Sequence, residues 1–172
     1  MMPKMCLLFL VACGGPEVDG PALQLGQGLF AEGCPVAGRS TARSIGVDAQ
    51  LDGFAAVGTR GDVLLMNEHA AFVITAPGKP QTTYWYYKGA LADAVPMDGC
   101  EPATIDKLDE LALVIGELDL LDISQSVLRG FRADSVTVLA DGSDGGPAIV
   151  RALGSDDTHW LVEYELIRDA PG

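Results

Sequence analysis

Apolar and polar positions alternate along much of the chain, which is the pattern of β-strands with one buried face. The clearest example is residues 160–167, where Glu163 and Glu165 alternate with apolar side chains and predict a strand with one solvated face. Further short strands are predicted over residues 63–66, 70–75, 82–87, 135–139 and 148–153. The pattern therefore indicates a mainly β protein.

Two turn sequences divide these strands into hairpins. Asn67-Glu68 lies between the strands at 63–66 and 70–75, and asparagine tolerates the left-handed backbone of tight turns. The Gly- and Asp-rich run at residues 141–146 is the strongest hairpin signal in the chain. Many short strands joined by such turns predict an antiparallel β-sandwich.

One segment has a different period. Its apolar residues recur at helical spacing: Ile105, Leu108, Leu111 and Ile115. Thr104 precedes them as a helix-capping residue, and Gly116 would end the series. We therefore expect one short helix near residues 104–111 in an otherwise β fold.

The N-terminus has the layout of a secretion signal. Lys4 precedes the apolar run at residues 7–11, and small residues follow the run. The run is too short for a bilayer span, which takes about 20 apolar residues. Residues 10–13, Leu-Val-Ala-Cys, resemble the lipobox of bacterial lipoproteins at all four positions.

The resemblance implies cleavage before Cys13 and lipidation of that cysteine, which would make the membrane a partner of the protein. Gly14, where an Asp would favour the inner membrane, implies the outer membrane, facing the periplasm or the cell surface. The alternative is a buried apolar N-terminal strand that ends in a cysteine. The expected organisation is a signal peptide (1–12), a lipidated Cys and flexible tether (13–33), a β-sandwich domain (34–168) and a linker-like tail (169–172).

Two cysteines remain in the expected sandwich domain, Cys34 and Cys100. An even pair in an oxidising compartment predicts a disulfide, which would stabilise the fold by about 4 kcal/mol in the chain-entropy model. The alternative is two separate buried thiols. The sequence has no Cys-x-x-Cys pair, so neither a zinc ribbon nor a thioredoxin-type site is supported.

Charge and motifs exclude several classes of function. The 172 residues carry 11 basic and 24 acidic side chains, a formal net charge of −13 that repels nucleic acid, so we expect no nucleic-acid partner. Gly-x-Ser-x-Gly is absent, and Gly26-x-Gly28 lacks the third glycine of a dinucleotide site. We expect no catalytic residue, no metal ligand and no cofactor.

The weaker candidates have simpler explanations. The loop at residues 141–146 lacks the EF-hand pattern and is interpreted as a hairpin turn instead of a calcium site. His69 and His159 are isolated in sequence and are interpreted as solvated residues at strand ends. Arg60-Gly61-Asp62 is interpreted as a tight turn into the next strand.

The best candidate for ligand binding is the aromatic run Tyr84, Trp85, Tyr86 and Tyr87. Consecutive residues of a strand point to opposite faces, so all four rings cannot enter one core. An exposed aromatic face is a surface on which sugars and partner proteins stack. The alternative is a strand packed between two sheets.

A second resemblance is weaker. Four stretches are similar to the N-terminal β-domain of large exported bacterial proteins, a mutarotase-like supersandwich: 61–69, 72–74, 89–93 and 141–150. The expected function is a lipid-anchored, non-catalytic binding or accessory domain whose ligand is a glycan or an envelope protein. The alternatives are a hydrolase or carbohydrate-processing enzyme that uses Asp and Glu with a His, and a truncated N-terminal module of a larger metallohydrolase.

Overall fold

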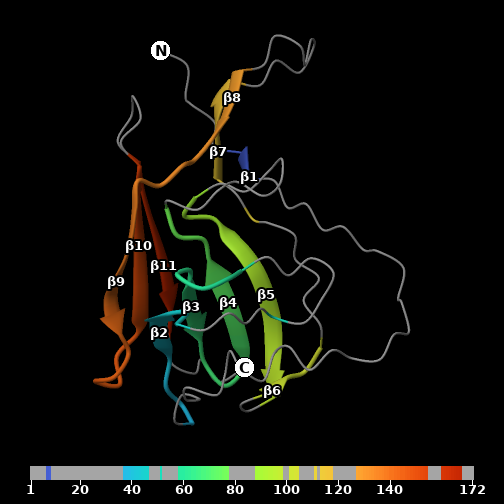
Figure 1. The fold of residues 1–172 in the computed structure, drawn as a ribbon, viewed down its shortest axis with the longest axis vertical. Coiled ribbons are helices and arrows are strands. Elements are labelled where there is room, and N and C mark those ends of the chain that lie inside the picture. The colour runs from blue at the N-terminus through green and yellow to red at the C-terminus, as the bar shows by residue number, and fades with distance from the viewer. Residues whose placement is uncertain are drawn as a thin grey trace.

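The computed structural model describes residues 7–8, 37–46, 51, 58–77, 88–98, 101–104, 111, 113–117, 127–154 and 160–167. These residues form strands β1 to β11 and no helix, which confirms the mainly β fold class (Figure 1). Accordingly, this part of the chain offers no helix that could cross a membrane.

The larger sheet is antiparallel and has the strand order β2–β3–β4–β5–β6. Its strands are β2 (Thr41–Ser44), β3 (Val63–Met66), β4 (Ala70–Ile74), β5 (Leu91–Asp98) and β6 (Glu101–Pro102). The hairpin predicted at Asn67-Glu68 is confirmed. Oδ1 of Asn67 accepts hydrogen bonds from the backbone N–H groups of His69 and Ala70, both at 2.9 Å, and this local bonding fixes the turn.

The smaller sheet is antiparallel and has β10 between β9 and β11. Its strands are β9 (Ser135–Asp141), β10 (Ala148–Gly154) and β11 (Trp160–Leu166). The predicted hairpin between β9 and β10 and the predicted strand near the C-terminus are both confirmed. Gly142 and Gly145 turn the chain between β9 and β10 with φ angles of 76° and 85°, which glycine adopts without steric cost.

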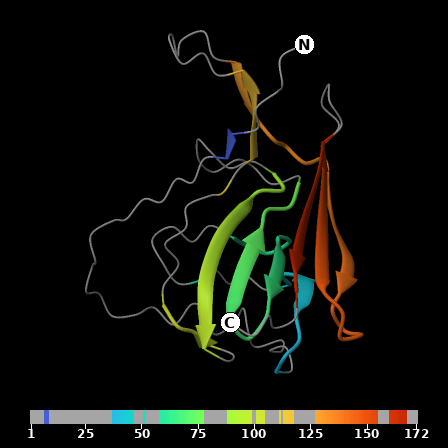
Figure 2. The same ribbon diagram turned by 180° about the vertical axis from the view of Figure 1, so that it is seen from behind.

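The inner faces of the two sheets pack against each other as a sandwich, and the smaller sheet forms one flank of it in both views (Figures 1 and 2). The shared core contains Ala42, Val63, Leu65, Ile74, Ala148 and Val150. β2 lies beside β9 at one side of the sandwich. There, Oγ of Ser40 accepts a 3.0 Å hydrogen bond from the N–H of Ala148 and donates to the carbonyl oxygen of Gly146 at 3.4 Å, so the residue before β2 joins the two sheets.

The other face of the larger sheet is buried as well. Its apolar cluster contains Leu64, Met66, Ala71, Val73, Val95 and Met97, with Ile45 and Leu51 packed on them. All four residues of β3 are therefore buried, which explains why the strand is an unbroken apolar run instead of an alternating one.

A third sheet, β1–β7–β8, lies beyond one end of the sandwich (Figure 1). Its strands are β1 (Leu7–Leu8), β7 (Leu113–Glu117) and β8 (Val127–Gly130). β1 belongs to the expected signal segment and pairs with β7.

The expected helix near residues 104–111 is not seen. Leu111 forms a β-bridge with Leu91, and Ile115 lies in β7, so a helix that extends to Ile115 is wrong. Residues 105–110 lie outside the described part. The same run also carries the two-residue period of a strand, and pairing with β8 decides in favour of the strand.

Candidate functional site

Most residues singled out from the sequence lie outside the described part of the chain. They are Cys13, Cys34, Cys100, His159 and the aromatic run Tyr84, Trp85, Tyr86 and Tyr87. Lipidation, the disulfide and the aromatic binding face therefore stay predictions. The described residues include three other candidate features: the His69 turn, the buried acids and the surface of the smaller sheet.

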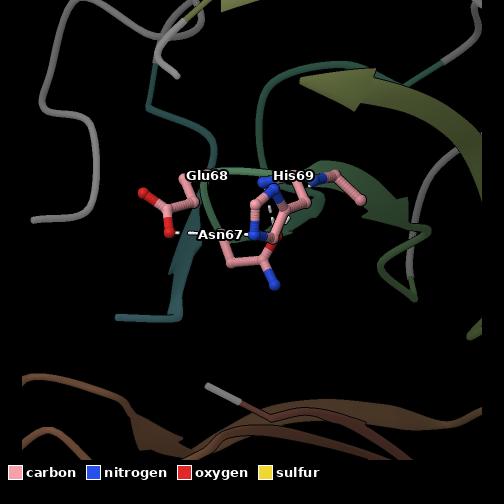
Figure 3. Close-up of polar contacts among 4 residues, drawn as sticks. Asn67, Glu68 and His69 are labelled. Carbon is pink, nitrogen blue, oxygen red and sulfur yellow. Dashed lines mark hydrogen bonds and ion pairs between the residues drawn. The ribbon is translucent and has the colours of Figure 1, made fainter. Parts of the chain in front are cut away.

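His69 lies at the tip of the β3–β4 hairpin, beside Asn67 and Glu68 (Figure 3). Nε2 of His69 is 3.7 Å from Oε1 of Glu68, and the histidine side chain is 63% exposed. Its backbone carbonyl accepts a 2.7 Å hydrogen bond from the N–H of Met97. The main chain of His69 thus contributes a hydrogen bond to the larger sheet, while its side chain is solvated, as the sequence predicted.

Two buried carboxylates bind main-chain N–H groups. Asp62 accepts from Thr59 at 2.7 Å and from Ala76 at 2.8 Å, and it completes the turn predicted at Arg60-Gly61-Asp62. Asp93 accepts a 2.6 Å hydrogen bond from the N–H of Gly58. Charge-assisted hydrogen bonds of this kind offset the cost of burying an acid. Both acids therefore attach loops to the larger sheet.

A side chain at position 58 would displace this arrangement. A Cβ on Gly58 would lie 2.5 Å from both Oδ2 of Asp93 and Cγ1 of Val73. The main chain at Gly58 can reach the buried carboxylate only because the residue lacks a side chain.

The β9–β10 loop uses its acids to form turns. Asp141 accepts a hydrogen bond from the N–H of Ser143 at 2.9 Å, and Asp144 accepts one from Gly146 at 2.8 Å. The Ser143 hydroxyl and backbone N–H, both bound to the Asp141 carboxylate, lower the pKa of Asp141 below its ordinary value. Among the described residues, no three His, Cys, Asp or Glu side chains gather closely enough to hold a metal ion.

The most unusual surface is the side of the smaller sheet that faces away from the sandwich core, here called the outer face. It consists of Ser135, Thr137, Leu139, Ile149, Arg151, Leu153, Leu161, Glu163 and Glu165, with Ile167 directly after β11. Four of its aliphatic side chains are widely exposed: Leu139 (45%), Leu153 (42%), Leu161 (52%) and Ile167 (55%).

Cross-strand pairing places these side chains side by side. Leu153 of β10 lies directly opposite Leu161 of β11, and Arg151 lies opposite Glu163. Nη2 and Nε of Arg151 donate to Oε1 of Glu163 at 2.6 and 2.9 Å. An exposed ion pair contributes under about 1 kcal/mol, so its main effect is to order the centre of the outer face.

β11 is fixed from its inner side. The Tyr164 hydroxyl donates a 2.6 Å hydrogen bond to the carbonyl oxygen of Gly89. Gly89 has a φ of 80°, and a Cβ there would lie 2.6 Å from Cβ of Ala133, so the position requires glycine. The strand that borders the outer face is thus held both by β10 and by the other sheet.

Alternation predicted the solvated side of β11 but not the exposed aliphatic residues on it. The signal was present in the sequence, because Leu161 and Ile167 share the two-residue period of Glu163 and Glu165. It becomes recognisable only when the register places Leu153 beside Leu161.

Comparisons with protein-family models, with curated proteins and with solved structures found no significant match.

Proposed function

We propose that this chain is an exported, lipid-anchored binding or accessory domain without catalysis of its own, and that its ligand is another protein of the cell envelope. The Leu-Val-Ala-Cys sequence at residues 10–13 supports export and lipidation of Cys13. The observation that carries the binding role is the exposed pair Leu153 and Leu161 on the outer face.

Aliphatic side chains exposed singly are common, but several on one strand face are typical of an interaction surface. The chemistry of the outer face favours a protein ligand. Sugars stack on aromatic rings, whereas this face offers leucine and isoleucine. The acidic chain, with Glu163 and Glu165 on the same face, disfavours contact with anionic lipid headgroups.

The described titratable residues support binding over the alternative hydrolase. The buried carboxylates of Asp62 and Asp93 accept main-chain hydrogen bonds, and His69 lies on a solvated turn. Each of these groups has a structural role: the two carboxylates fix loops, and the histidine lies in a turn. A general acid or base must lie within hydrogen-bond reach of the reacting atoms.

The lipid anchor is tested by changing Cys13 to Ala and separating membranes from soluble material. The unchanged chain is expected in the membrane fraction and Cys13→Ala in the soluble fraction. A Cys34→Ala variant is the matched control and is expected to stay membrane-bound. Membrane association of Cys13→Ala equal to that of the unchanged chain would refute the anchor.

The binding face is tested with a photo-crosslinking residue at Thr137, on the outer face, and at Glu101, an exposed residue of the other sheet. In envelopes of the native host, we expect a discrete cross-linked protein from position 137 and none from position 101. Combined Leu153→Ser and Leu161→Ser changes should abolish that product without unfolding the domain. Equal products from both positions, or cross-links to lipid from position 137, would overturn the proposal.

A further inference from the structure

The outer face ends at β11, which is the last strand of its sheet. The sandwich is closed where β9 lies beside β2, whereas the other side of β11 borders no strand among the described residues. In an antiparallel ladder, alternate residues direct their N–H and C=O groups away from the neighbouring strand. An end strand therefore offers a hydrogen-bonding edge to which an extended segment can add.

The exposed side chains along this edge follow a fixed sequence of apolar and acidic residues. Leu161, Glu163, Glu165 and Ile167 occupy every second position, and all four are exposed. Two acids thus lie between two aliphatic residues. Glu163 is bound by Arg151, whereas no cation of the described residues lies within salt-bridge distance of the Glu165 carboxylate. This edge favours an added strand whose outward residues are basic at the centre and apolar at both ends.

The geometry points to β11 as a docking edge for an extended segment of a partner protein with the pattern apolar-x-basic-x-basic-x-apolar. This inference rests on the proposed binding function and gives the chemistry of its ligand. Main-chain hydrogen bonds would provide the attachment, as in other cases of strand addition. Opposite charges and apolar pairs across the two strands would select the partner. The pattern reads the same in both directions, and we expect the antiparallel one, because both strand pairs of this sheet are antiparallel.

A second copy of this chain fits the same edge poorly. Two-fold pairing of β11 with itself over its full length places Leu161 opposite Ile167, but it also places Glu163 opposite Glu165 twice. A shift by one pair places Glu163 or Glu165 opposite its own copy. Like charges in direct cross-strand positions are destabilising, and each copy already carries a net charge of −13.

β11 is held in an extended conformation before any ligand arrives. All seven of its residues pair with β10, and the Tyr164 hydroxyl attaches it to Gly89. Little of the docking edge needs to be ordered on binding, which lowers the entropic cost of association.

The test uses the full chain with the Cys13→Ala change and a blocked, labelled peptide, Val-Thr-Lys-Thr-Lys-Thr-Val, in a fluorescence anisotropy titration. Matched peptides replace both lysines by glutamate, or carry N-methyl groups on one edge or on the other. The protein variants are Glu165→Lys and Glu101→Lys, which change the net charge equally at different places.

We expect saturable binding of the lysine peptide and none of the glutamate peptide. N-methyl groups on the peptide edge that faces β11 should abolish binding, whereas N-methyl groups on the opposite edge should leave it unchanged. Glu165→Lys should lower the affinity for the lysine peptide about tenfold and should create binding of the glutamate peptide. Glu101→Lys should change the affinity for either peptide by no more than about twofold. Equal effects of the two protein variants, or binding that tolerates methylation of both edges, would overturn strand addition. If cross-linking from position 137 persists while no peptide binds, strand addition fails and the protein-binding proposal stands.

Discussion

The hydroxyl of Tyr164 in β11 donates a 2.6 Å hydrogen bond to the carbonyl oxygen of Gly89, which precedes β5 of the other sheet. The two residues are 75 positions apart in the chain, and their bond attaches the end strand of the smaller sheet to the larger one. The stability of β11 therefore depends on a contact outside its own ladder.

Changing Tyr164 to Phe keeps the ring and removes this bond. We expect the free energy of unfolding to fall by about 1–3 kcal/mol, because the part-buried Gly89 carbonyl loses its donor. Urea denaturation measures the change, and hydrogen exchange should show the largest loss of protection in β11. An unchanged denaturation midpoint would contradict the structural role of the bond.

Two glycines of the β9–β10 loop form a matched pair. Both have positive φ, but a Cβ on Gly142 would collide with the carbonyl oxygen of Ser40, whereas a Cβ on Gly145 would meet nothing within 4 Å. We expect Gly145→Ala to cost about 1 kcal/mol for its left-handed backbone and Gly142→Ala about 3 kcal/mol, because the collision adds to that cost. Thermal or urea unfolding of both variants checks the difference. Equal destabilisation would mean that Ser40 does not pack against Gly142.

The turn at Asp141 should contribute to stability in a pH-dependent way. Ser143 lowers the pKa of Asp141 in the folded protein, so the unfolded chain binds a proton more readily. The resulting stability is complete above the unfolded pKa of about 3.9 and is lost as the pH falls through the lower, folded pKa. Asp141→Asn should therefore lower the urea midpoint at pH 7, and its difference from the unchanged protein should vanish in strong acid.

A Ser143→Ala change provides the control for this prediction. It removes the hydroxyl that contributes most to the shift and should raise the pKa of Asp141 toward its ordinary value, as followed by carboxyl NMR titration. A pKa of Asp141 unaffected by loss of Ser143 would assign the shift to another cause.

The disulfide predicted between Cys34 and Cys100 can be tested on the exported chain. Thiol labelling in denaturant without reductant should leave both cysteines unmodified, and reduction should lower the free energy of unfolding by about 4 kcal/mol. A Cys34→Ser, Cys100→Ser double variant should reproduce the stability of the reduced protein. Labelling of either cysteine before reduction would contradict the bridge.

The hairpins were predictable because the information that forms them is local. Asn67 binds N–H groups two and three residues further on, and Asp141 binds that of Ser143, so each turn is specified by its own residues. The solvated side of β11 was predictable for the same reason, because a two-residue period can be recognised without knowing the neighbouring strand.

The remaining features depend on which strands become neighbours. Ile115 satisfies both a helical and a strand period, and pairing of β7 with β8 decides between them. The exposed pair Leu153 and Leu161 exists only because β10 and β11 align in one register. The bond from Tyr164 to Gly89 requires both sheets to be in place, so no local pattern could indicate it.

Ser40 accepts the N–H of Ala148, at the first residue of β10, while the chain that follows it enters β2. One hydroxyl group thus joins the start of a strand in each sheet. Opening either sheet breaks this junction and exposes the core of the other, so we expect the sandwich to melt as one cooperative unit. Hydrogen exchange at the amides of β3 and β10 would then report the same opening free energy. Limited proteolysis would yield no fragment in which one sheet stays folded.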